Sequence, residues 1–254
     1  MRIVRYSRQG EVGFGILEDE NVAAISPHPF AAFEYTGERF PTVEARQLAP
    51  VLPTKVVAVG RNYAEHAREM GGEVTAEPVI FLKPSTAVIG PNDPIIYPTG
   101  VDRVDYEGEL AAIVGKLTRR VDEADAMQAV LGFACANDVT ARNLQKVDGQ
   151  WTRAKGFDTF CPLGPWIETD LDSSDLALRT LVDGEARQSS RTSMLEHGVA
   201  SLIAFVSSVM TLLPGDVLLT GTPAGVGPLQ VGSRVEVEVE GIGVLANPVV
   251  AEPE

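Results

Sequence analysis

The sequence predicts a β-rich α+β fold, because short apolar and β-branched segments recur along its 254 residues between turns that contain glycine and proline. Few segments show the three-and-four spacing of apolar residues that marks an amphipathic helix. A chain of this length buries a substantial core, so it needs neither a disulfide nor a metal merely to fold.

The first fifty residues are expected to form short strands. Residues 2–7 alternate, Gly10 marks a turn, and residues 12–17 continue as a second strand. Prolines then break the chain repeatedly, and residues 50–53 have the composition of a linker. We therefore expect a small β-rich N-terminal domain over residues 1–52 and a second domain over residues 53–254.

The middle of the chain combines apolar strands with two short helices. Strands are expected over residues 55–59, 79–82, 109–114 and 133–137. A helix over residues 62–70 would be capped by Asn62 and ended by Gly71, and a helix over residues 122–131 would end at Gly132. The segment 84–98 contains four prolines and is not expected to be helical.

The C-terminal part contains the clearest helix signal, since apolar residues recur at three and four positions over residues 199–213. A turn at residues 214–216 leads into a strand over residues 217–220. Valines at 235, 237 and 239 then alternate with glutamates at 236, 238 and 240, which is typical of a half-exposed strand.

The chain carries 21 basic and 35 acidic residues, a net charge of −14. A surface this acidic repels nucleic acid and anionic membranes, so neither is an expected partner. The N-terminus lacks the apolar segment of a signal peptide, and the apolar stretch at 199–213 is too short to span a bilayer. We expect a soluble, cytoplasmic protein in which Cys135 and Cys161 are reduced, buried thiols.

Glu107 and Glu109 form the most informative pair in the sequence. On a strand, residues two apart share a face and lie about 6.5–7 Å apart, so the two carboxylates would repel each other. A divalent cation offsets that repulsion, and oxygen ligands suit Mg²⁺ or Mn²⁺. Asp138, at the end of a small apolar strand, is the natural third ligand. The plainer alternatives are a solvated face for the glutamates and a helix N-cap for Asp138.

Other side chains suit acid–base chemistry or anion binding. His66 and Glu69 lie three residues apart on the predicted helix, where a carboxylate would orient the imidazole as a base. Arg142 and Gln145 would share a helical face near Asp138, and a guanidinium suits a carboxylate. Ordinary helix contacts and surface pairs are the plainer interpretations of both.

Lys155 and the glycine-rich residues 221–227 complete the candidate features. Phenylalanines at 157 and 160 could hold Lys155 out of bulk water, although most lysines are solvated. The glycine-rich segment follows a predicted strand and resembles a ligand-binding loop, with a tight turn as the alternative. It matches neither a P-loop nor a dinucleotide fingerprint, so a nucleotide-linked role finds no support.

Taken together, five ordered segments of the chain resemble the fumarylacetoacetate hydrolase superfamily. They are residues 60–69, 105–110, 136–142, 155–165 and 213–227. The resemblance implies a rolled mixed β-sheet with few helices, usually in a homodimer. The first fifty residues resemble the small extra domain that many bacterial members carry.

The resemblance also implies residue roles. Glu107, Glu109 and Asp138 match the metal ligands, for Mg²⁺ or Mn²⁺, and His66 and Glu69 match the dyad that activates water. The matching substrate positions are Arg142, Gln145, Lys155 and Thr222, and we also expect Lys155 to act in catalysis. One departure is Asn143, which stands where aspartate is usual and could weaken a bond to Arg142.

These roles imply an enzyme that acts on a small 2-oxo or enol carboxylic acid. Its metal would serve as a Lewis acid and stabilise an enolate. Hydrolysis of a C–C bond or decarboxylation, on an acylpyruvate, oxaloacetate or a related diacid, is the main expectation. The first alternative is an isomerase of 5-carboxymethyl-2-hydroxymuconate or 2-hydroxyhepta-2,4-diene-1,7-dioate in aromatic-acid breakdown. An inactive metal-binding scaffold is a second alternative of another class.

Overall fold

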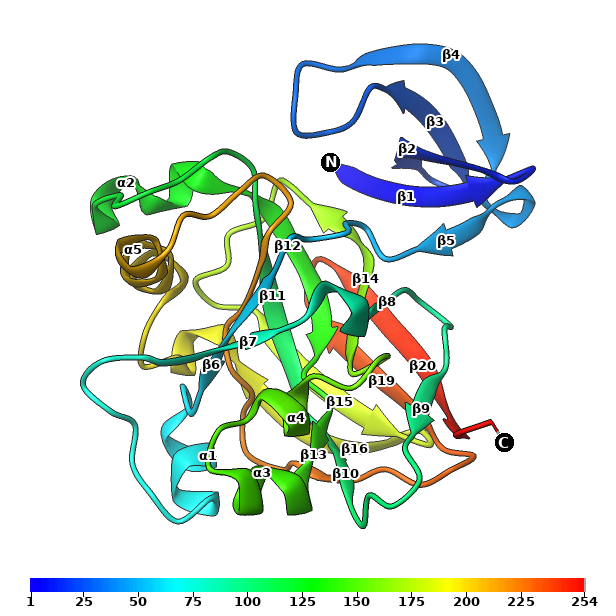
Figure 1. The fold of residues 1–254 in the computed structure, drawn as a ribbon. Coiled ribbons are helices and arrows are strands. Elements are labelled where there is room, and N and C mark those ends of the chain that lie inside the picture. Colours follow the sequence, from blue (N-terminus) through cyan, green and yellow to red (C-terminus); the bar gives the residue numbers. More distant parts are fainter. Residues whose placement is uncertain (254) are drawn as a thin grey trace.

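The computed structural model describes residues 1–253, and three β-sheets carry the fold within them (Figure 1). The largest sheet has twelve strands, in the order β4-β3-β2-β1-β14-β12-β11-β17-β6-β7, with β5 paired to β1 and β8 paired to β14. Only β17–β6 and β8–β14 are parallel within this sheet, so it is mixed. The predicted β-rich α+β class is confirmed.

The N-terminal strands form one end of the largest sheet, at the top of Figure 1. They are β1 (Arg2–Arg8), β2 (Glu11–Glu18), β3 (Asn21–Ser26), β4 (Glu34–Pro41) and β5 (Arg46–Leu48). The expected strands at 2–7 and 12–17 are confirmed as the β1–β2 hairpin. Backbone pairing of Arg2 with Glu168 joins β1 to β14, and therefore joins this end to the rest of the sheet.

The remaining strands of the largest sheet cross the body of the molecule. They are β6 (Val56–Gly60), β7 (Val79–Lys83), β8 (Val88–Ile89), β11 (Gly108–Val114), β12 (Val130–Asn137), β14 (Cys161–Glu168) and β17 (Val217–Leu219). Alternate residues of β11 face two different apolar clusters, with Leu110 in one and Ala111 in the other. Burial on both faces explains why these strands are almost continuously apolar.

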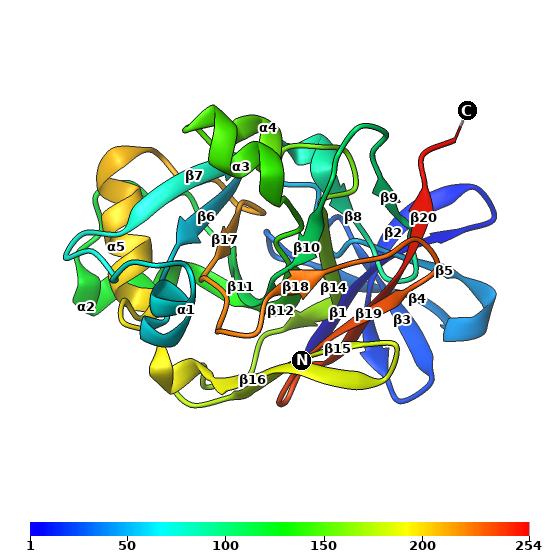
Figure 2. The same cartoon turned by 90° about the horizontal axis from the view of Figure 1, so that it is seen from below.

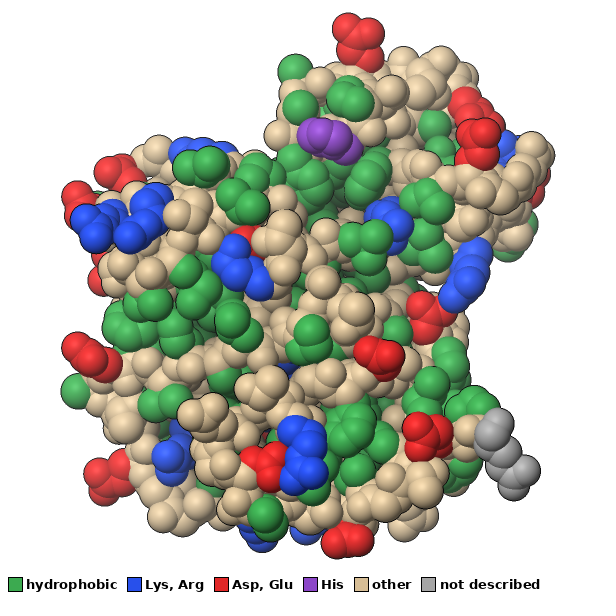
Figure 3. All heavy atoms as spheres, in the orientation of Figure 1, with side chains coloured by type: hydrophobic (Ala, Val, Ile, Leu, Met, Phe, Trp, Pro, Cys, Tyr) green, Lys and Arg blue, Asp and Glu red, His purple; other side chains and the backbone are tan. Residues whose placement is uncertain are grey.

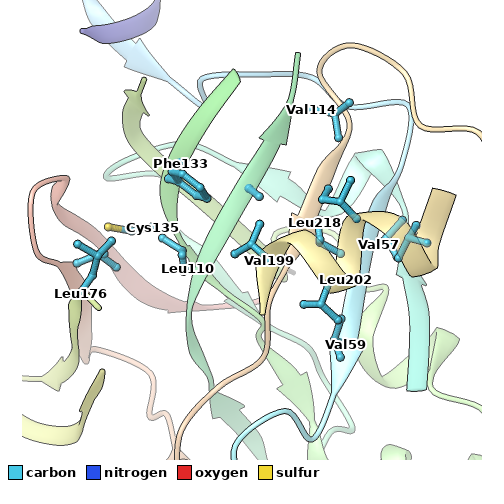
Figure 4. Close-up of a cluster of buried hydrophobic side chains, with 14 of the residues drawn as sticks. Val57, Val59, Leu110, Val114, Phe133, Cys135, Leu176, Val199, Leu202 and Leu218 are labelled. Atoms are coloured by element: carbon cyan, nitrogen blue, oxygen red, sulfur yellow. The ribbon is translucent and has the colours of Figure 1, made fainter. Parts of the chain in front are cut away.

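The first of these clusters lies between the largest sheet, helix α5 (Val199–Val209) and the five-stranded sheet. Figure 4 shows Leu218 and Val59 of the sheet beside Leu202 of α5, and Leu110 of the same cluster beside Cys135. The strands of the five-stranded sheet, in spatial order, are β16 (Glu185–Arg191), β15 (Ala177–Val182), β19 (Arg234–Val239), β20 (Gly243–Ala251) and β9 (Ile95–Tyr97).

Small elements collect at one end of the body. A three-stranded sheet contains β13 (Thr140–Ala141), β10 (Val104–Tyr106) and β18 (Gly227–Pro228). Three short helices, α1 (Ala64–Glu69), α3 (Arg142–Asp148) and α4 (Thr152–Lys155), lie at the same end. Seen from below, α1 lies on one side of the strands β6 and β11, and α3 and α4 lie on the other side (Figure 2).

The helix predicted over residues 122–131 is confirmed only in part, because it ends two residues early and its second half is a 3-10 turn. One α-turn forms, α2 (Glu123–Ala126), followed by a 3-10 turn, η3 (Met127–Ala129). Val130 already begins β12 and pairs with Val114. Gly132, expected as a helix stop, lies inside this strand, where a Cβ would fall 2.4 Å from the carbonyl oxygen of Glu168. Tertiary pairing with β11 and β14 therefore overrides the local helical spacing.

Two helices begin after the residues that were considered as their N-caps, Asn62 and Asp138. The first is α1, whose N-cap is Tyr63, because the Asn62 side chain is used elsewhere: it donates to the backbone oxygens of His197 and Thr220 at 2.9 and 2.8 Å. The second is α3, which starts at Arg142, so Asp138 is not its cap. Helix α5 matches the strongest prediction but ends at Val209, because Leu212 forms a β-bridge with Thr118.

The remaining sequence expectations for the body hold. Residues 84–98 contain no α-helix, only the 3-10 turn η2 (Ser85–Ala87) and the strands β8 and β9. Both Cys135 and Cys161 are free and buried. Within residues 1–253, no helix has the length and apolarity needed to cross a membrane. Acidic and basic side chains are scattered over the face drawn in Figure 3, without a continuous basic patch.

Candidate functional site

Three buried carboxylates converge where β11 and β12 meet the small three-stranded sheet. Glu107 lies between β10 and β11, Glu109 lies in β11, and Asp138 directly follows β12. Pairing of Gly108 with Asn137 aligns the two strands, and the Asp138 N–H donates to the Glu107 backbone oxygen at 2.8 Å. One carboxylate oxygen from each of the three residues lies within 4.8 Å of the others. The side chains predicted as metal ligands are thus brought together.

Buried cations neutralise two of these carboxylates. The Lys155 ammonium group donates to Glu107 Oε2 at 2.7 Å and to Asp138 Oδ2 at 2.6 Å. Arg142 Nη2 donates to Glu107 Oε1 at 2.5 Å. Glu109 instead accepts from the backbone N–H of Gly221 at 2.6 Å, and none of the salt bridges among the described residues involves it.

This unequal distribution of cations shifts the pKa values of the two glutamates in opposite directions. Burial by itself would raise the pKa of Glu107, but Lys155 and Arg142 outweigh it and hold that pKa well below its usual range. Burial raises the pKa of Glu109 well above its usual range, and the neighbouring charges of Asp138 and Glu107 raise it further. Glu109 is therefore the carboxylate that most needs additional positive charge.

The donor set fits a hard divalent cation. Three carboxylates supply oxygen ligands and leave positions for water and substrate around an ion such as Mg²⁺ or Mn²⁺. The Lys155 ammonium group, held between Glu107 and Asp138, shows that positive charge is accepted among these oxygens. The uncompensated charge of Glu109 gives a further reason for a cation there.

The His66–Glu69 dyad forms on α1 as predicted by its spacing. His66 Nδ1 lies 3.1 Å from Glu69 Oε2, and the His66 side chain is only 6% exposed. Glu69 also accepts from the Gly225 N–H at 3.2 Å, which ties α1 to the glycine-rich loop. Since Nδ1 is engaged, Nε2 is the nitrogen left for chemistry in the cavity that His66 lines.

A cavity of about 190 Å³ opens onto this group. At about 30 Å³ per water molecule, it holds the equivalent of roughly six waters and suits a small acid. Glu107, Glu109 and Lys155 form buried parts of its wall, and Phe81 and Trp151 form an apolar part. The remaining lining residues are Val59, Gly60, Arg61, His66, Met70, Arg142, Gln145, Lys146 and Thr222.

The predicted substrate positions also line this cavity, but their polar groups are largely engaged. Arg142 donates to Gln145 Oε1 at 2.7 Å and to Asp105 Oδ2 at 2.9 Å. The Thr222 hydroxyl donates to the Gly108 backbone oxygen at 2.9 Å and accepts from Gln188 Nε2 at 2.8 Å. A substrate at Thr222 can therefore use only the remaining lone pair of this hydroxyl, or its backbone.

The concern that Asn143 weakens the support of Arg142 was misplaced. The Asn143 amide donates to Asp102 Oδ2 at 3.4 Å, and among the described residues it forms no hydrogen bond with the Arg142 guanidinium. The fully buried carboxylate of Asp105 orients Arg142, and Asp105 is itself paired with Arg103 at 2.6 Å. The Arg142 guanidinium is thus supported from β10, and the 37-residue separation between Asp105 and Arg142 explains why the sequence alone did not reveal this pair.

Sequence reasoning missed Lys83 and Gln188. Lys83 is completely buried and donates to Asp138 Oδ1 at 2.6 Å and to the Val139 backbone oxygen at 3.2 Å. Its only signal in the sequence was a lysine directly after the predicted strand 79–82. Gln188, from β16, accepts from the Gly108 N–H at 3.0 Å and thereby fixes the backbone between the two glutamates. No local pattern in the sequence pointed to it.

Comparison with known proteins shows the family to which the chain belongs. The family model described as Fumarylacetoacetate (FAA) hydrolase C-terminal matches residues 55–250, and the one described as Rv2993c-like, N-terminal matches residues 1–50. Protein Rv2993c of Mycobacterium tuberculosis is 50% identical and is aligned over 98% of both chains. The mitochondrial oxaloacetate tautomerase FAHD2A of Bos taurus is 45% identical over 83% of this chain and 71% of its own.

Solved structures agree with this relationship. The 5-carboxymethyl-2-hydroxymuconate delta-isomerase of Mycobacterium smegmatis is 51% identical with a TM-score of 0.94, covering 99% of this chain and 100% of its own. The 2-hydroxyhepta-2,4-diene-1,7-dioate isomerase of Mycobacterium marinum is 48% identical with a TM-score of 0.94, covering 100% of both.

A more distant structure contains a metal. It is the maleylpyruvate hydrolase of a Sphingobium species with manganese(II) and pyruvate, 30% identical with a TM-score of 0.84 and full coverage of both chains. The resemblance drawn from five short segments is thus confirmed along the whole chain. Because a family model covers residues 55–250 and a relative is half identical from end to end, this chain belongs to the fumarylacetoacetate hydrolase family, in its Rv2993c-like group.

Proposed function

We propose that this protein is a divalent-metal-dependent isomerase or tautomerase of small 2-oxo or 2-hydroxy dicarboxylic acids. The observation that carries the proposal is the cavity in which the His66 imidazole and the buried carboxylates Glu107 and Glu109 line one small space. That arrangement suits the movement of a proton beside an oxo group. The names of the similar isomerases and the tautomerase favour this reaction over the hydrolysis or decarboxylation that we expected first.

The chain's own residues supply the acid–base part of the reaction. The His66 Nε2 atom receives a proton from the enol oxygen or from carbon and returns it to another position, so that no atom is gained or lost. Glu69 holds the ring through Nδ1. The phenyl and indole walls limit water beside the reacting carbon. When bound at the three carboxylates, a divalent cation supplies Lewis-acid charge for the oxo and carboxylate oxygens.

Product analysis tests this proposal directly. Purified protein with Mg²⁺, Mn²⁺ or EDTA is given enol-oxaloacetate, 2-hydroxyhepta-2,4-diene-1,7-dioate and acetylpyruvate, and products are followed by ultraviolet absorption and NMR. We expect metal-dependent isomerisation of the first two at rates well above that of acetylpyruvate cleavage. Full activity after exhaustive chelation, or cleavage as the fastest reaction, would contradict it.

Hydrolysis of a C–C bond is the second candidate function. The His66–Glu69 dyad is also the arrangement that activates a water molecule, and a maleylpyruvate hydrolase shares the fold. Release of a carboxylic acid and pyruvate in the same panel would identify it. Loss of CO₂ from oxaloacetate would identify decarboxylation instead.

Replacing His66 with glutamine is expected to lower the turnover number about 10²- to 10⁴-fold, the usual contribution of a positioned acid–base group. Metal affinity, measured by calorimetry with Mn²⁺, should change little, because none of the three carboxylates bonds to His66. The matched control is His28→Gln, an exposed histidine in the N-terminal region. Equal rates for His66→Gln and His28→Gln would exclude His66 as the base.

Replacing Gly60 with alanine is expected to lower kcat/KM about 10- to 100-fold, because misplacing a cavity wall by an ångström has effects of that size. The added Cβ would lie 2.5 Å from the Trp151 ring, which packs edge-on against Phe81 at 5.2 Å. Gly198→Ala is the control, since nothing lies within 4 Å of the position that an added Cβ would take and its backbone is ordinary. An unchanged kcat/KM in Gly60→Ala would show that Trp151 does not shape the site.

We also propose that the domain boundary lies between residues 52 and 53 and that the protein forms a homodimer, as its family implies. Light scattering during gel filtration measures the oligomeric state. Limited proteolysis around the predicted linker tests the position of the domain boundary. A monomer at micromolar concentration would count against the dimer.

A further inference from the structure

Two of the four cations that line the cavity are already committed to the protein's own carboxylates. Lys155 bonds to Glu107 and Asp138, and Arg142 bonds to Asp105 and Glu107. Their positive charge therefore offsets buried negative charge and leaves little for a second anionic group on a substrate. In a chain with a net charge of −14, a dicarboxylic acid needs further local cations.

Arg61 and Lys146 are the other two cations, and they differ from the first pair. Among residues 1–253, neither side chain takes part in any salt bridge, and neither donates a side-chain hydrogen bond to another residue. Lys146 is exposed and Arg61 is partly exposed, whereas Lys155 and Glu109 are buried. The uncommitted cations thus occupy the outer part of the cavity, and the carboxylate cluster occupies its inner part.

The backbone conformation at Arg61 is unusual for an arginine. Its φ is 57°, in the left-handed region that arginine seldom adopts, directly after the buried strand β6. The guanidinium group passes over Gly72, where a Cβ would fall 2.3 Å from Arg61 Nη1. Glycine at position 72 therefore leaves room for this arginine. Lys146 lies on α3, next to the cavity-lining Gln145.

We propose that Arg61 and Lys146 bind the distal carboxylate of a dicarboxylic substrate whose 2-oxo end lies at the inner carboxylate cluster. This rests on the proposed function and adds to it the residues that select diacids over monoacids. A guanidinium fork and an ammonium group both form charge-assisted hydrogen bonds to a carboxylate. Since the distal group does not react, its recognition changes binding more than turnover.

A matched pair of ligands tests the proposal without turnover. 2-Oxoglutarate and 2-oxopentanoate share a five-carbon 2-oxo acid and differ only in a terminal carboxylate against a methyl group. Calorimetry with Mg²⁺-loaded protein should give at least tenfold tighter binding of 2-oxoglutarate. In the double variant Arg61→Gln/Lys146→Gln this ratio should fall to about one, with the affinity for 2-oxopentanoate unchanged.

The control is Arg68→Gln, an exposed arginine of α1 that does not line the cavity, and it should keep the wild-type ratio. With a diacid substrate, the double variant should raise KM at least tenfold while kcat stays within about threefold. Thermal melting should match the wild type, because neither side chain has a protein partner to lose.

The outcomes separate this inference from the proposed function. A wild-type preference for 2-oxoglutarate that survives in the double variant would overturn the role of Arg61 and Lys146, as would equal binding of the two ligands by the wild type. Diacid selectivity that depends on these residues, without any isomerase activity, would support the inference and refute the proposed reaction.

Discussion

Glu109→Gln is expected to lower metal-dependent turnover roughly 10²- to 10³-fold while leaving the metal-free fold intact. Glu109 has no cationic partner, and burial together with Asp138 raises its pKa, so a neutral amide resembles its protonated form. The amide oxygen can still accept from the Gly221 N–H. Losing one charged ligand removes several kcal/mol of charge stabilisation, which corresponds to a rate loss of roughly 10²- to 10³-fold.

The measurement combines Mn²⁺ calorimetry, turnover and thermal melting in EDTA. Glu109→Gln should bind Mn²⁺ far more weakly and melt like the wild type. Glu107→Gln is a poorer probe, because it leaves Lys155 and Arg142 buried with less compensation. The control is Glu238→Gln, from the Glu-x-Glu repeat of β19, whose side chain is 44% exposed. Wild-type Mn²⁺ affinity in Glu109→Gln would refute the proposed ligand set.

Lys83→Met is expected to destabilise the protein by about 3–5 kcal/mol, the usual cost of removing one partner from a buried ion pair. Lys83 is completely inaccessible and lies between Asp138 Oδ1 and the Val139 backbone oxygen. Methionine fills similar space but donates no hydrogen bond. Because Asp138 is then held only by Lys155, metal affinity should also fall about 10- to 100-fold, as for other residues that orient a ligand.

Denaturant unfolding and Mn²⁺ calorimetry measure the two effects of this change separately. Lys116→Met, at an exposed lysine, is the control and should lie within about 0.5 kcal/mol of the wild type. If Lys83→Met unfolds with the wild-type free energy, the ion pair with Asp138 contributes nothing measurable. If stability falls but metal affinity does not, Lys83 is a structural residue only.

The sequence predicted strands more reliably than helices. Strands such as β6 and β11 have a short apolar run that burial on both faces requires, so their pattern is unambiguous. The segment 122–131 has helical spacing, yet its last two residues belong to β12, where Val130 pairs with Val114 of β11. Local periodicity cannot predict whether such a segment becomes helix or strand, because the partner strand lies elsewhere in the chain.

The same distinction applies to the site. The convergence of Glu107, Glu109 and Asp138 was predictable, since the first two lie two residues apart where the chain enters β11, and the end of the neighbouring strand β12 supplies the third. Their cationic partners were harder to find. Lys83 lies 55 residues before Asp138 in the chain, and a lysine at a strand end usually points to solvent. Only the fold reveals that it is buried.

The parallel pairing of β17 with β6 has a consequence for how the protein is made. In the sheet, β17 lies between β11 and β6. It therefore separates β6 and β7, which are next to Arg61 and His66 and contain Lys83, from β11 and β12, which carry Glu109 and lead to Asp138. Residue 217 is translated long after residue 56, so contacts that close this sheet span about 160 positions and form slowly. During synthesis β6 therefore waits for β17 before this part of the sheet can close, and activity during refolding should not recover before this pairing forms.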